Sequence, residues 1–222
     1  MQTDLPSHLD LANHHSNATV SDIEKLCDDV IGYGFNAAFV NPTYITVAKM
    51  RLGGKAKVGT VISFPLGQDT VEMKMNASQE SMKLGADELD IVPNNGLIGV
   101  DVSAYTEEMK TIVYATRTVN ADIVIKFILE TGYLTSEQIK TGALAIVDAG
   151  ADFVKICSGM GRRGASLGDV KLVKEAIGDR AQIKVAGGID TLEEAQGFLS
   201  AGANRIGTSA AVKIIEEFRA ST

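Results

Sequence analysis

The stretch Gly150-Ala-Asp-Phe-Val-Lys155 joins the end of a predicted helix to a short apolar run, and its outline recurs along the chain. Similar joints, each with a glycine just before a predicted strand, are Gly34-Phe-Asn-Ala, Gly85-Ala-Asp-Glu and Gly202-Ala-Asn-Arg. Glycine is favoured at a helix end because it adopts the left-handed conformation without a steric penalty. The recurrence indicates a repeated helix-to-strand unit.

Short apolar or β-branched runs predict eight strands, near residues 7–11, 36–41, 57–64, 87–92, 122–129, 152–157, 182–186 and 204–207. The segments between them have helical spacing. Three of these helices have recognisable start signals, which are Ser21 with Glu24, Ser136 ahead of Glu137 and Gln138, and Thr191 with Glu194.

Eight alternating strands and helices in 222 residues match the lower size range of a (β/α)8 TIM barrel. An open doubly wound sheet is the alternative. The barrel is favoured because no GxGxxG follows the first strand and because charged residues occur in several strands, as a central site requires. We expect an α/β protein with a single (β/α)8 barrel domain over residues 1–222.

The composition excludes several classes of protein. The formal charge of −7 and the absence of a basic run argue against nucleic acid or an anionic membrane as a partner. Cys27 and Cys157 lack the spacing of a disulfide framework or a zinc site. The first residues do not form a signal peptide, and no apolar run approaches the ~20 residues of a membrane span. We expect a cytoplasmic protein with a small-molecule substrate.

Charged residues interrupt four of the predicted buried strands. Lys126, Lys155 and Lys184 lie in the fifth, sixth and seventh strands, and Asp90 lies in the fourth. A buried charge needs a partner, and neighbouring strands of a barrel bring their inward side chains together. These residues therefore predict a buried, charged site.

Crowded lysines suit nucleophilic chemistry. Ammonium groups packed together destabilise one another, so that one becomes a neutral amine that attacks carbonyl groups. Asp90 could then move protons, as Schiff-base aldol chemistry requires. The alternative is that each lysine forms only a structural ion pair, and for Lys126, paired with Asp90 or Glu130, we prefer this interpretation.

Glycine-rich turns follow the last two predicted strands, at Ala186-Gly-Gly-Ile-Asp190 and Gly207-Thr-Ser-Ala210. Loops at these places in barrels often bind phosphate through backbone amides and a helix N-terminus. Glycine also serves ordinary tight turns, so each turn alone is a weak signal, but their position after the last two strands favours a phosphate site. His14 and His15, after the first strand, could contact substrate or be inert. Cys157 should face the interior with Lys155, where it could simply fill space.

The chain resembles the deoxyribose-phosphate aldolases, a family of class I aldolases, along essentially its whole length. The matching segments are Leu9-Asp10 with Ala18-Thr19, Val40-Asn-Pro42, Val61-Ile-Ser-Phe-Pro-Leu-Gly67, Gly85-Ala-Asp-Glu-Leu-Asp-Ile-Val92, Lys126 with Glu130-Thr-Gly132, Gly150-Ala-Asp-Phe-Val-Lys155, Lys184 with Ala186-Gly-Gly-Ile189, and Arg205-Ile-Gly-Thr-Ser209.

The resemblance implies reversible cleavage of 2-deoxy-D-ribose 5-phosphate to D-glyceraldehyde 3-phosphate and acetaldehyde. It implies that Lys155 forms the Schiff base, that Lys184 keeps this amine uncharged and that Asp90 shuttles protons through a water. Asp10 and Lys126 would support the polar network. Phosphate and substrate would meet Gly159, Gly187, Gly188, Gly207 and Ser209. The resemblance implies no metal or organic cofactor, and a homodimer.

The chain departs from the family pattern at positions close to this chemistry, which are Ala12, Asn13, His14, His15, Ile156, Cys157 and Ala210. Some of these departures remove hydroxyl groups beside the substrate. We expect this loss to affect which sugar is accepted more than it affects the amine chemistry. The alternatives are a related Schiff-base lyase or transaldolase for another phosphosugar, and a phosphosugar-binding protein without turnover.

Overall fold

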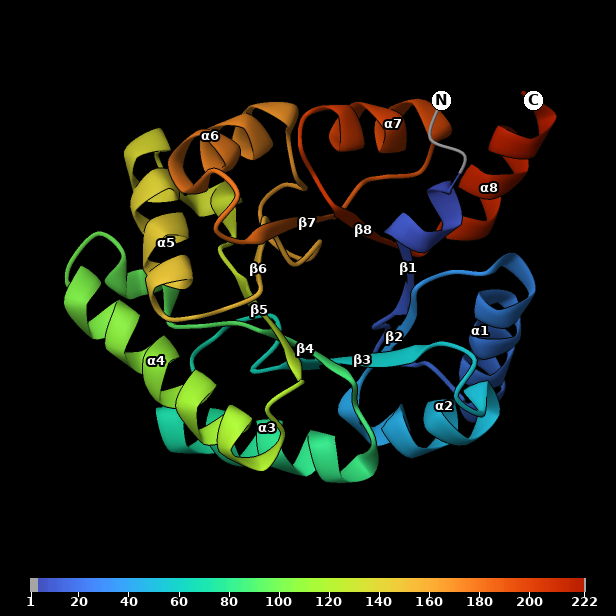
Figure 1. The fold of residues 1–222 in the computed structure, drawn as a ribbon, viewed down its shortest axis with the longest axis horizontal. Coiled ribbons are helices and arrows are strands. Elements are labelled where there is room, and N and C mark those ends of the chain that lie inside the picture. Colours follow the sequence, from blue (N-terminus) through green and yellow to red (C-terminus); the bar gives the residue numbers. More distant parts are fainter. Residues whose placement is uncertain (1–3, 222) are drawn as a thin grey trace.

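The computed structural model describes residues 4–221, so the predicted domain limits at residues 1 and 222 lie outside the described residues. Within them the strands form a closed parallel barrel in chain order, β1 to β8, with β8 paired to β1. Figure 1 shows the barrel in the centre and the helices around it. The predicted (β/α)8 barrel is confirmed, and the open doubly wound sheet is wrong.

The strands are β1 Leu9–Asn13, β2 Ala37–Val40, β3 Lys57–Ile62, β4 Glu88–Ile91, β5 Val124–Ile128, β6 Phe153–Lys155, β7 Gln182–Ala186 and β8 Arg205–Thr208. The α-helices are α1 Val20–Tyr33, α2 Ile45–Leu52, α3 Val71–Leu84, α4 Val102–Val119, α5 Ser136–Asp148, α6 Leu167–Ile177, α7 Leu192–Ser200 and α8 Ala211–Ala220. Short 3-10 helices are η1 Leu5–His8, η2 Pro42–Tyr44, η3 Asn95–Leu97 and η4 Thr131–Tyr133.

Two residues of each helix-to-strand joint, the glycine and the polar residue two positions after it, have a structural role. Their glycines are left-handed, with φ of 75° at Gly34 and 109° at Gly85 where these residues end α1 and α3. In three of the four joints the acidic or amide side chain that follows accepts an amide hydrogen bond from the preceding strand, whereas Asn36 donates to Asp10 in β1. Asp87 accepts from the Val58 amide at 2.9 Å, and Asp152 from the Ile125 amide at 2.7 Å. Each joint therefore ends a helix and anchors a neighbouring strand.

The predicted helix starts are right at one position and displaced at two. Thr191 and Glu194 form the predicted capping box of α7. For α1 the cap is Thr19 with Asp22 rather than Ser21, and for α5 it is Thr135 with Gln138 rather than Ser136. In both corrected cases a threonine one or two residues earlier has the extended backbone that a cap requires, and its side chain accepts from the third helical amide.

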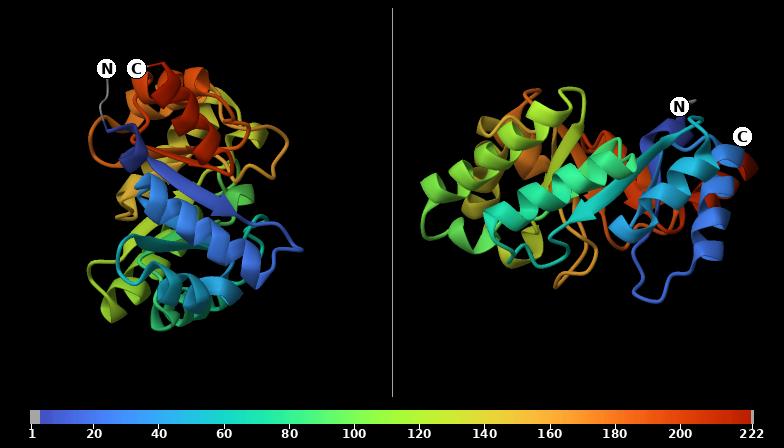
Figure 2. Two further views of the ribbon diagram at one scale, coloured as in Figure 1. Left: turned by 90° about the vertical axis from the view of Figure 1, so that its right-hand side faces the viewer. Right: turned by 90° about the horizontal axis from the view of Figure 1, so that it is seen from below.

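The strand order places the carboxyl ends of all eight strands at one end of the barrel. In the right-hand view of Figure 2, the loops after β1 and β6 extend from this end together. The apolar core lies mainly between the barrel and its helices, with Leu89, Ile125, Val154 and Ile206 fully buried. The outward side chains of the strands pack under the helices. The side chains that point into the barrel therefore form a separate set from this apolar core.

Candidate active site

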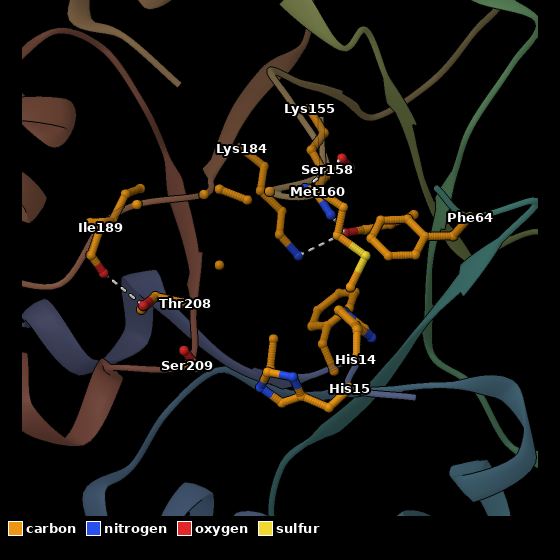
Figure 3. A pocket seen from close by; sticks show the side chains of 18 of the residues that line it. His14, His15, Phe64, Lys155, Ser158, Met160, Lys184, Ile189, Thr208 and Ser209 are labelled. Atoms are coloured by element: carbon orange, nitrogen blue, oxygen red, sulfur yellow. Dashed lines mark hydrogen bonds and ion pairs between the residues drawn. The ribbon is translucent and has the colours of Figure 1, made fainter. Parts of the chain in front are cut away.

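A cavity of about 200 Å³ opens at the carboxyl ends of the strands. Its lining includes eight residues predicted from the sequence, which are Asp90, Lys155, Gly159, Lys184, Gly187, Gly188, Gly207 and Ser209. Figure 3 shows Lys155 and Lys184 on neighbouring strands, facing Thr208, Ser209 and the His14–His15 segment across the cavity. Asp10 and Lys126 are fully buried and do not line the cavity. We call this cavity the catalytic pocket.

The register of the strands brings the charged side chains together. Asp90 is the direct partner of Lys126 across β4 and β5, and Lys155 is the partner of Lys184 across β6 and β7. Side chains of paired residues in adjacent strands point to the same face, which here is the barrel interior. The four charged positions read from the sequence therefore converge.

Asp90 is the centre of the cluster. Its Oδ2 atom lies 2.8 Å from the Lys155 Nζ and 3.0 Å from the Lys184 Nζ, so two ammonium groups share one oxygen. Burial alone would raise the pKa of Asp90, but Lys126, Lys155 and Lys184 outweigh burial and hold this pKa well below its usual range. Asp90 is therefore an ionised carboxylate at neutral pH, able to accept a proton or to orient a water.

Lys184 is buried between two carboxylates and an aromatic ring. Its Nζ lies 2.8 Å from the Asp10 Oδ2 and 3.3 Å from the centre of the Phe39 ring. Burial lowers the pKa of Lys184, although Asp10 and Asp90 oppose this effect. A Cβ at position 207 would lie 3.1 Å from the Lys184 Cε, so Gly207 leaves the space that this side chain occupies.

Lys126 forms the structural ion pairs that we preferred for it, but only one of the two predicted partners is right. Its Nζ lies 3.1 Å from the Asp90 Oδ1 and 2.6 Å from the Glu88 Oε2. Glu130 is not a partner, because it follows β5 and its Oε2 accepts the Ser158 amide at 3.0 Å. Glu88 faces inward because it lies two residues before Asp90 on the same strand.

The charges of this cluster do not balance. Among the described residues it holds three carboxylates, Asp10, Glu88 and Asp90. They contact four buried or largely buried cationic groups, Lys126, Lys155, Lys184 and Arg205, and one half-exposed lysine, Lys57, which pairs with Glu88. Within this cluster, Lys126 and Lys184 each contact two carboxylates, whereas Lys155 contacts one. Of the three buried lysines, Lys155 therefore has the fewest carboxylate contacts.

We expect Lys126→Met to lower the free energy of unfolding by about 3–5 kcal/mol, because Asp90 Oδ1 then has no cation beside it in the described residues and Glu88 Oε2 loses its nearest one. Urea unfolding would measure the change. The matched control is Lys57→Met, which removes a half-exposed lysine 3.2 Å from the same Glu88 and should cost less than about 1 kcal/mol. Equal effects of the two substitutions would contradict a structural role for Lys126.

The loops after β6 and β7 pack backbone against backbone beside the catalytic pocket. A Cβ at Gly187 would lie 2.8 Å from the Gly159 Cα, and one at Gly164 would lie 2.2 Å from the Gly187 oxygen. Gly188 has a left-handed φ of 70° and no neighbouring atom within 4 Å of its Cβ position. Gly159 and Gly187 therefore allow a close approach of two loops, and Gly188 allows a turn that leaves open space.

The loop after β8 leads from the catalytic pocket into α8. Ser209 lines the pocket, and the N-cap of α8 is Ala210, whose side chain cannot cap the helix. The first amide groups of a helix carry a partial positive charge and bind anions when no side chain occupies them. This end of the pocket can therefore bind an anionic group.

His14 is one of two histidines that line the pocket. Its ring centre lies 5.3 Å from that of Phe64, and its Nδ1 is buried with no hydrogen-bond partner in residues 4–221. Burial, reinforced by Lys155, lowers the pKa of His14 to about 3. The sequence left the role of His14 open, and the structure gives it a neutral ring at the pocket wall.

We expect His14→Leu to weaken the acid dependence of stability. The folded pKa lies below the usual 6.5, so as pH falls from 7 to 5 the unfolded state takes up a proton that the folded state does not. His14 therefore makes the protein lose about 1–2 kcal/mol over this range, and the variant should lose that much less. Urea unfolding at both pH values tests this, with His15→Leu as control; an unchanged pH dependence would contradict it.

Cys157 is not among the described residues that line the catalytic pocket, and its expected position facing the interior with Lys155 stays a prediction. The thiol is buried and lies 2.7 Å from the Ala186 oxygen. Burial raises its pKa to about 11, which keeps it a thiol and leaves it a space-filling residue.

Four further residues complete the site and were not predicted. Glu88 and Arg205 belong to the ion-pair cluster. Phe39 and Phe64 line the catalytic pocket. Glu88 had a detectable signal, because it stands two positions before Asp90 in the same strand. Phe39 lies beside both Lys126 and Lys184, at 4.8 and 3.3 Å from ring centre to Nζ. Phenylalanine in an apolar strand carries no sign of this role.

No group of acidic, cysteine or histidine side chains within residues 4–221 is arranged to hold a metal ion. In the same part of the chain, no helix combines the length and apolar character needed to cross a membrane.

The fold and the pocket define a class of protein. It is a (β/α)8 barrel with two lysines and a carboxylate in contact at the carboxyl ends of its strands, which is the arrangement of a Schiff-base enzyme. Residues 6–215 match the model of the DeoC/LacD family aldolases. The chain belongs to this family.

Individual relatives agree with the family match. The chain is 44% identical over 204 residues to a deoxyribose-phosphate aldolase of Thermoanaerobacter sp. (strain X514), with 91% of each chain covered. It is 42% identical to a deoxyribose-phosphate aldolase of Thermococcus gammatolerans, with 97% of each covered. The structure of the Aeropyrum pernix deoxyribose phosphate aldolase, a tetramer, superposes with a TM-score of 0.89 at 31% identity, covering 99% of this chain and 92% of that one.

Proposed function

We propose that this chain is a class I aldolase that reversibly cleaves 2-deoxy-D-ribose 5-phosphate to D-glyceraldehyde 3-phosphate and acetaldehyde. The observation that carries the proposal is the contact of Lys155 and Lys184 with one oxygen of Asp90 at the floor of the catalytic pocket. The curated relatives named above support the choice of sugar.

Lys155 is the nucleophile in this proposal. Among the three buried lysines of the cluster it alone contacts a single carboxylate, and it lines the open pocket, so its amine is the group placed to meet a substrate. In the proposal Lys184, paired with Asp10, supplies the neighbouring positive charge that favours the neutral amine of Lys155.

The reaction then follows from the positions of these groups. The Lys155 amine adds to C1 of the open-chain sugar, and loss of water from the carbinolamine gives an iminium ion. Asp90, acting through a water, removes the proton of the 3-hydroxyl group as the C2–C3 bond breaks. D-glyceraldehyde 3-phosphate leaves, and the remaining enamine takes a proton at C2. Hydrolysis of the resulting iminium ion releases acetaldehyde and restores the amine.

The phosphate of the substrate is proposed to lie at the loops after β7 and β8. Gly188, Gly207 and Ser209 line the pocket there, and the uncapped N-terminus of α8 follows. The left-handed turn at Gly188 leaves open space for phosphate oxygens. Gly159 and Gly187 act by holding the loops after β6 and β7 together.

A coupled assay for D-glyceraldehyde 3-phosphate, released from deoxyribose 5-phosphate, tests the proposed function. We expect turnover with this sugar. Turnover only with other phosphosugars would indicate a related Schiff-base lyase or transaldolase. Binding of the sugar without turnover would indicate a non-catalytic binding protein. The proposed homodimer stays a prediction, to be tested by light scattering of the purified chain.

A further inference from the structure

A buried ion pair joins α3 to α4 outside the catalytic pocket. The Lys74 Nζ lies 2.6 Å from the Glu108 Oε1, and the two side chains are 0% and 7% exposed. Neither residue is among the described residues that line the catalytic pocket. A buried ion pair is often no more stabilising than apolar residues of the same size, so its presence here calls for a reason other than stability.

Both members of this pair also bind loops at the carboxyl ends of the strands. The Lys74 Nζ donates to the Gly67 oxygen at 2.7 Å, in the loop that follows β3. Glu108 accepts the Asn94 amide, at 3.2 and 3.4 Å from its two oxygens, in the loop that follows β4. The ion pair therefore connects two loops at the end of the barrel where the catalytic pocket opens.

The loop after β3 is tightly folded where Lys74 binds it. The Gly67 amide donates to the Ser63 oxygen at 2.7 Å and closes a turn that contains Phe64. A Cβ at Gly67 would lie 2.3 Å from the Pro93 oxygen, so the turn packs directly against the loop after β4. Ser63 has a left-handed φ of 56°, which is unfavourable for a residue with a side chain. Surrounding contacts must hold the turn in this conformation, and Lys74 provides one of them.

Phe64 is the residue of this turn that reaches the reacting groups. Its ring centre lies 5.8 Å from the Lys155 Nζ and 5.3 Å from the centre of the His14 ring. Figure 3 shows the Phe64 ring at the wall of the catalytic pocket. An aromatic ring attracts a neighbouring cation, and the iminium ion formed on Lys155 is a cation. A displaced Phe64 ring would therefore stabilise this intermediate less well.

We propose that the Lys74–Glu108 ion pair positions Phe64 for the aldolase reaction. It acts through the turn that Gly67 closes, and this turn holds the Phe64 ring beside the amine of Lys155. The inference rests on the proposed function, because the reacting nitrogen is that of Lys155. Lys74 and Glu108 are thus positioning residues that do not touch the substrate.

Removal of both charges separates positioning from stability. Replacement of a buried ion pair by apolar residues is often tolerated, whereas removal of one partner leaves an unpaired charge. We therefore expect the double variant Lys74→Met with Glu108→Leu to unfold at a higher temperature than Lys74→Met alone. Its kcat for deoxyribose 5-phosphate should still fall about tenfold, because the Gly67 oxygen and the Asn94 amide have lost their anchor.

The Michaelis constant gives a second readout of the double variant. KM should stay within about twofold of the unaltered value, because the phosphate is bound at the loops after β7 and β8. An unchanged kcat in the folded double variant would overturn the positioning role. If this variant does not fold, Glu108→Gln replaces it, since its amide keeps one oxygen acceptor and the same size. A kcat fall of about threefold is then expected, and an unchanged kcat would again overturn the role.

A double-mutant cycle tests whether Phe64 carries the effect. Phe64→Ala should lower kcat about tenfold, and Lys74→Met with Glu108→Leu should lower it no further once the Phe64 ring is absent. Such non-additive losses would support the path through Phe64. Losses that multiply would overturn it, because the ion pair would then act on catalysis by another route.

The matched control is Lys49→Met, which removes an ion pair at the other end of the barrel. The Lys49 Nζ lies 2.7 Å from the Asp87 Oδ1, just before β4, so its loss should lower the unfolding temperature and leave kcat unchanged. An equal loss of kcat in Lys49→Met would overturn the positioning role, because kcat would then follow stability. Absence of sugar cleavage in the unaltered chain would overturn the proposed function and the positioning role together.

Discussion

Lys155→Ala is expected to reduce the cleavage of deoxyribose 5-phosphate by about 10⁴-fold or more, because no other lysine that lines the catalytic pocket can replace its amine. Lys184 is the only other lysine among the pocket's described lining residues, and it is held by Asp10 and Asp90. The coupled assay at substrate saturation would measure the loss in kcat.

The fold should survive this substitution. Without Lys155 each oxygen of Asp90 keeps a cation, because Lys126 contacts Oδ1 and Lys184 contacts Oδ2. We therefore expect a cooperative thermal transition in Lys155→Ala. Lys213→Ala, at an exposed lysine of α8, is the matched control and should keep full activity. Substantial turnover by a folded Lys155→Ala variant would rule out the proposed nucleophile.

Lys184→Leu is expected to lower the rate at neutral pH by about 100-fold and to move the rising limb of the pH–rate profile to higher pH. Lys184 places a second positive charge on the Asp90 oxygen that Lys155 contacts, and this charge favours the neutral amine of Lys155. Without Lys184 that repulsion is lost while Asp90 stays beside Lys155, so the charged form of Lys155 is favoured. More hydroxide is then needed to obtain the neutral amine.

The pH profile separates this effect from a structural one. Asp10 keeps Arg205 at 2.9 Å and Asn36 at 2.8 Å when Lys184 is removed, and leucine can pack on the Phe39 ring. Lys126→Met serves as the comparison, because it should lower stability more than it moves the profile. An unshifted profile in Lys184→Leu would show that Lys184 does not control the charge of the nucleophile.

The fold could be predicted because two local signals agreed. Apolar runs marked the strands, and glycines such as Gly34 and Gly85 marked the helix ends that precede them. The boundaries were less accurate. Thr19 rather than Ser21 caps α1, since several polar residues precede the helix and only the backbone conformation selects one of them.

The centre of the site could be predicted because a lysine in an apolar strand is a strong signal. Asp90, Lys155 and Lys184 needed only the strand order to be brought together. The partners of Lys126 were predicted only in part. Asp90 is a partner, but Glu88 on β4 was missed and Glu130, just after β5, was expected in its place. The direction of each side chain decides, and Glu130 turns toward the loop after β6.

The walls of the site could not be predicted from residue types. Phe39 and Phe64 are ordinary apolar residues in the sequence, and their contacts with Lys184 and His14 depend on how distant loops and strands meet.

Reductive trapping tests the central claim most directly. The chain is incubated with acetaldehyde and sodium borohydride, which reduces an imine to a stable secondary amine, and the modified peptide is identified by mass spectrometry. We predict one adduct, on Lys155, and none in Lys155→Ala. No adduct in the unaltered chain, or an adduct on Lys184 or another lysine in place of Lys155, would contradict the account.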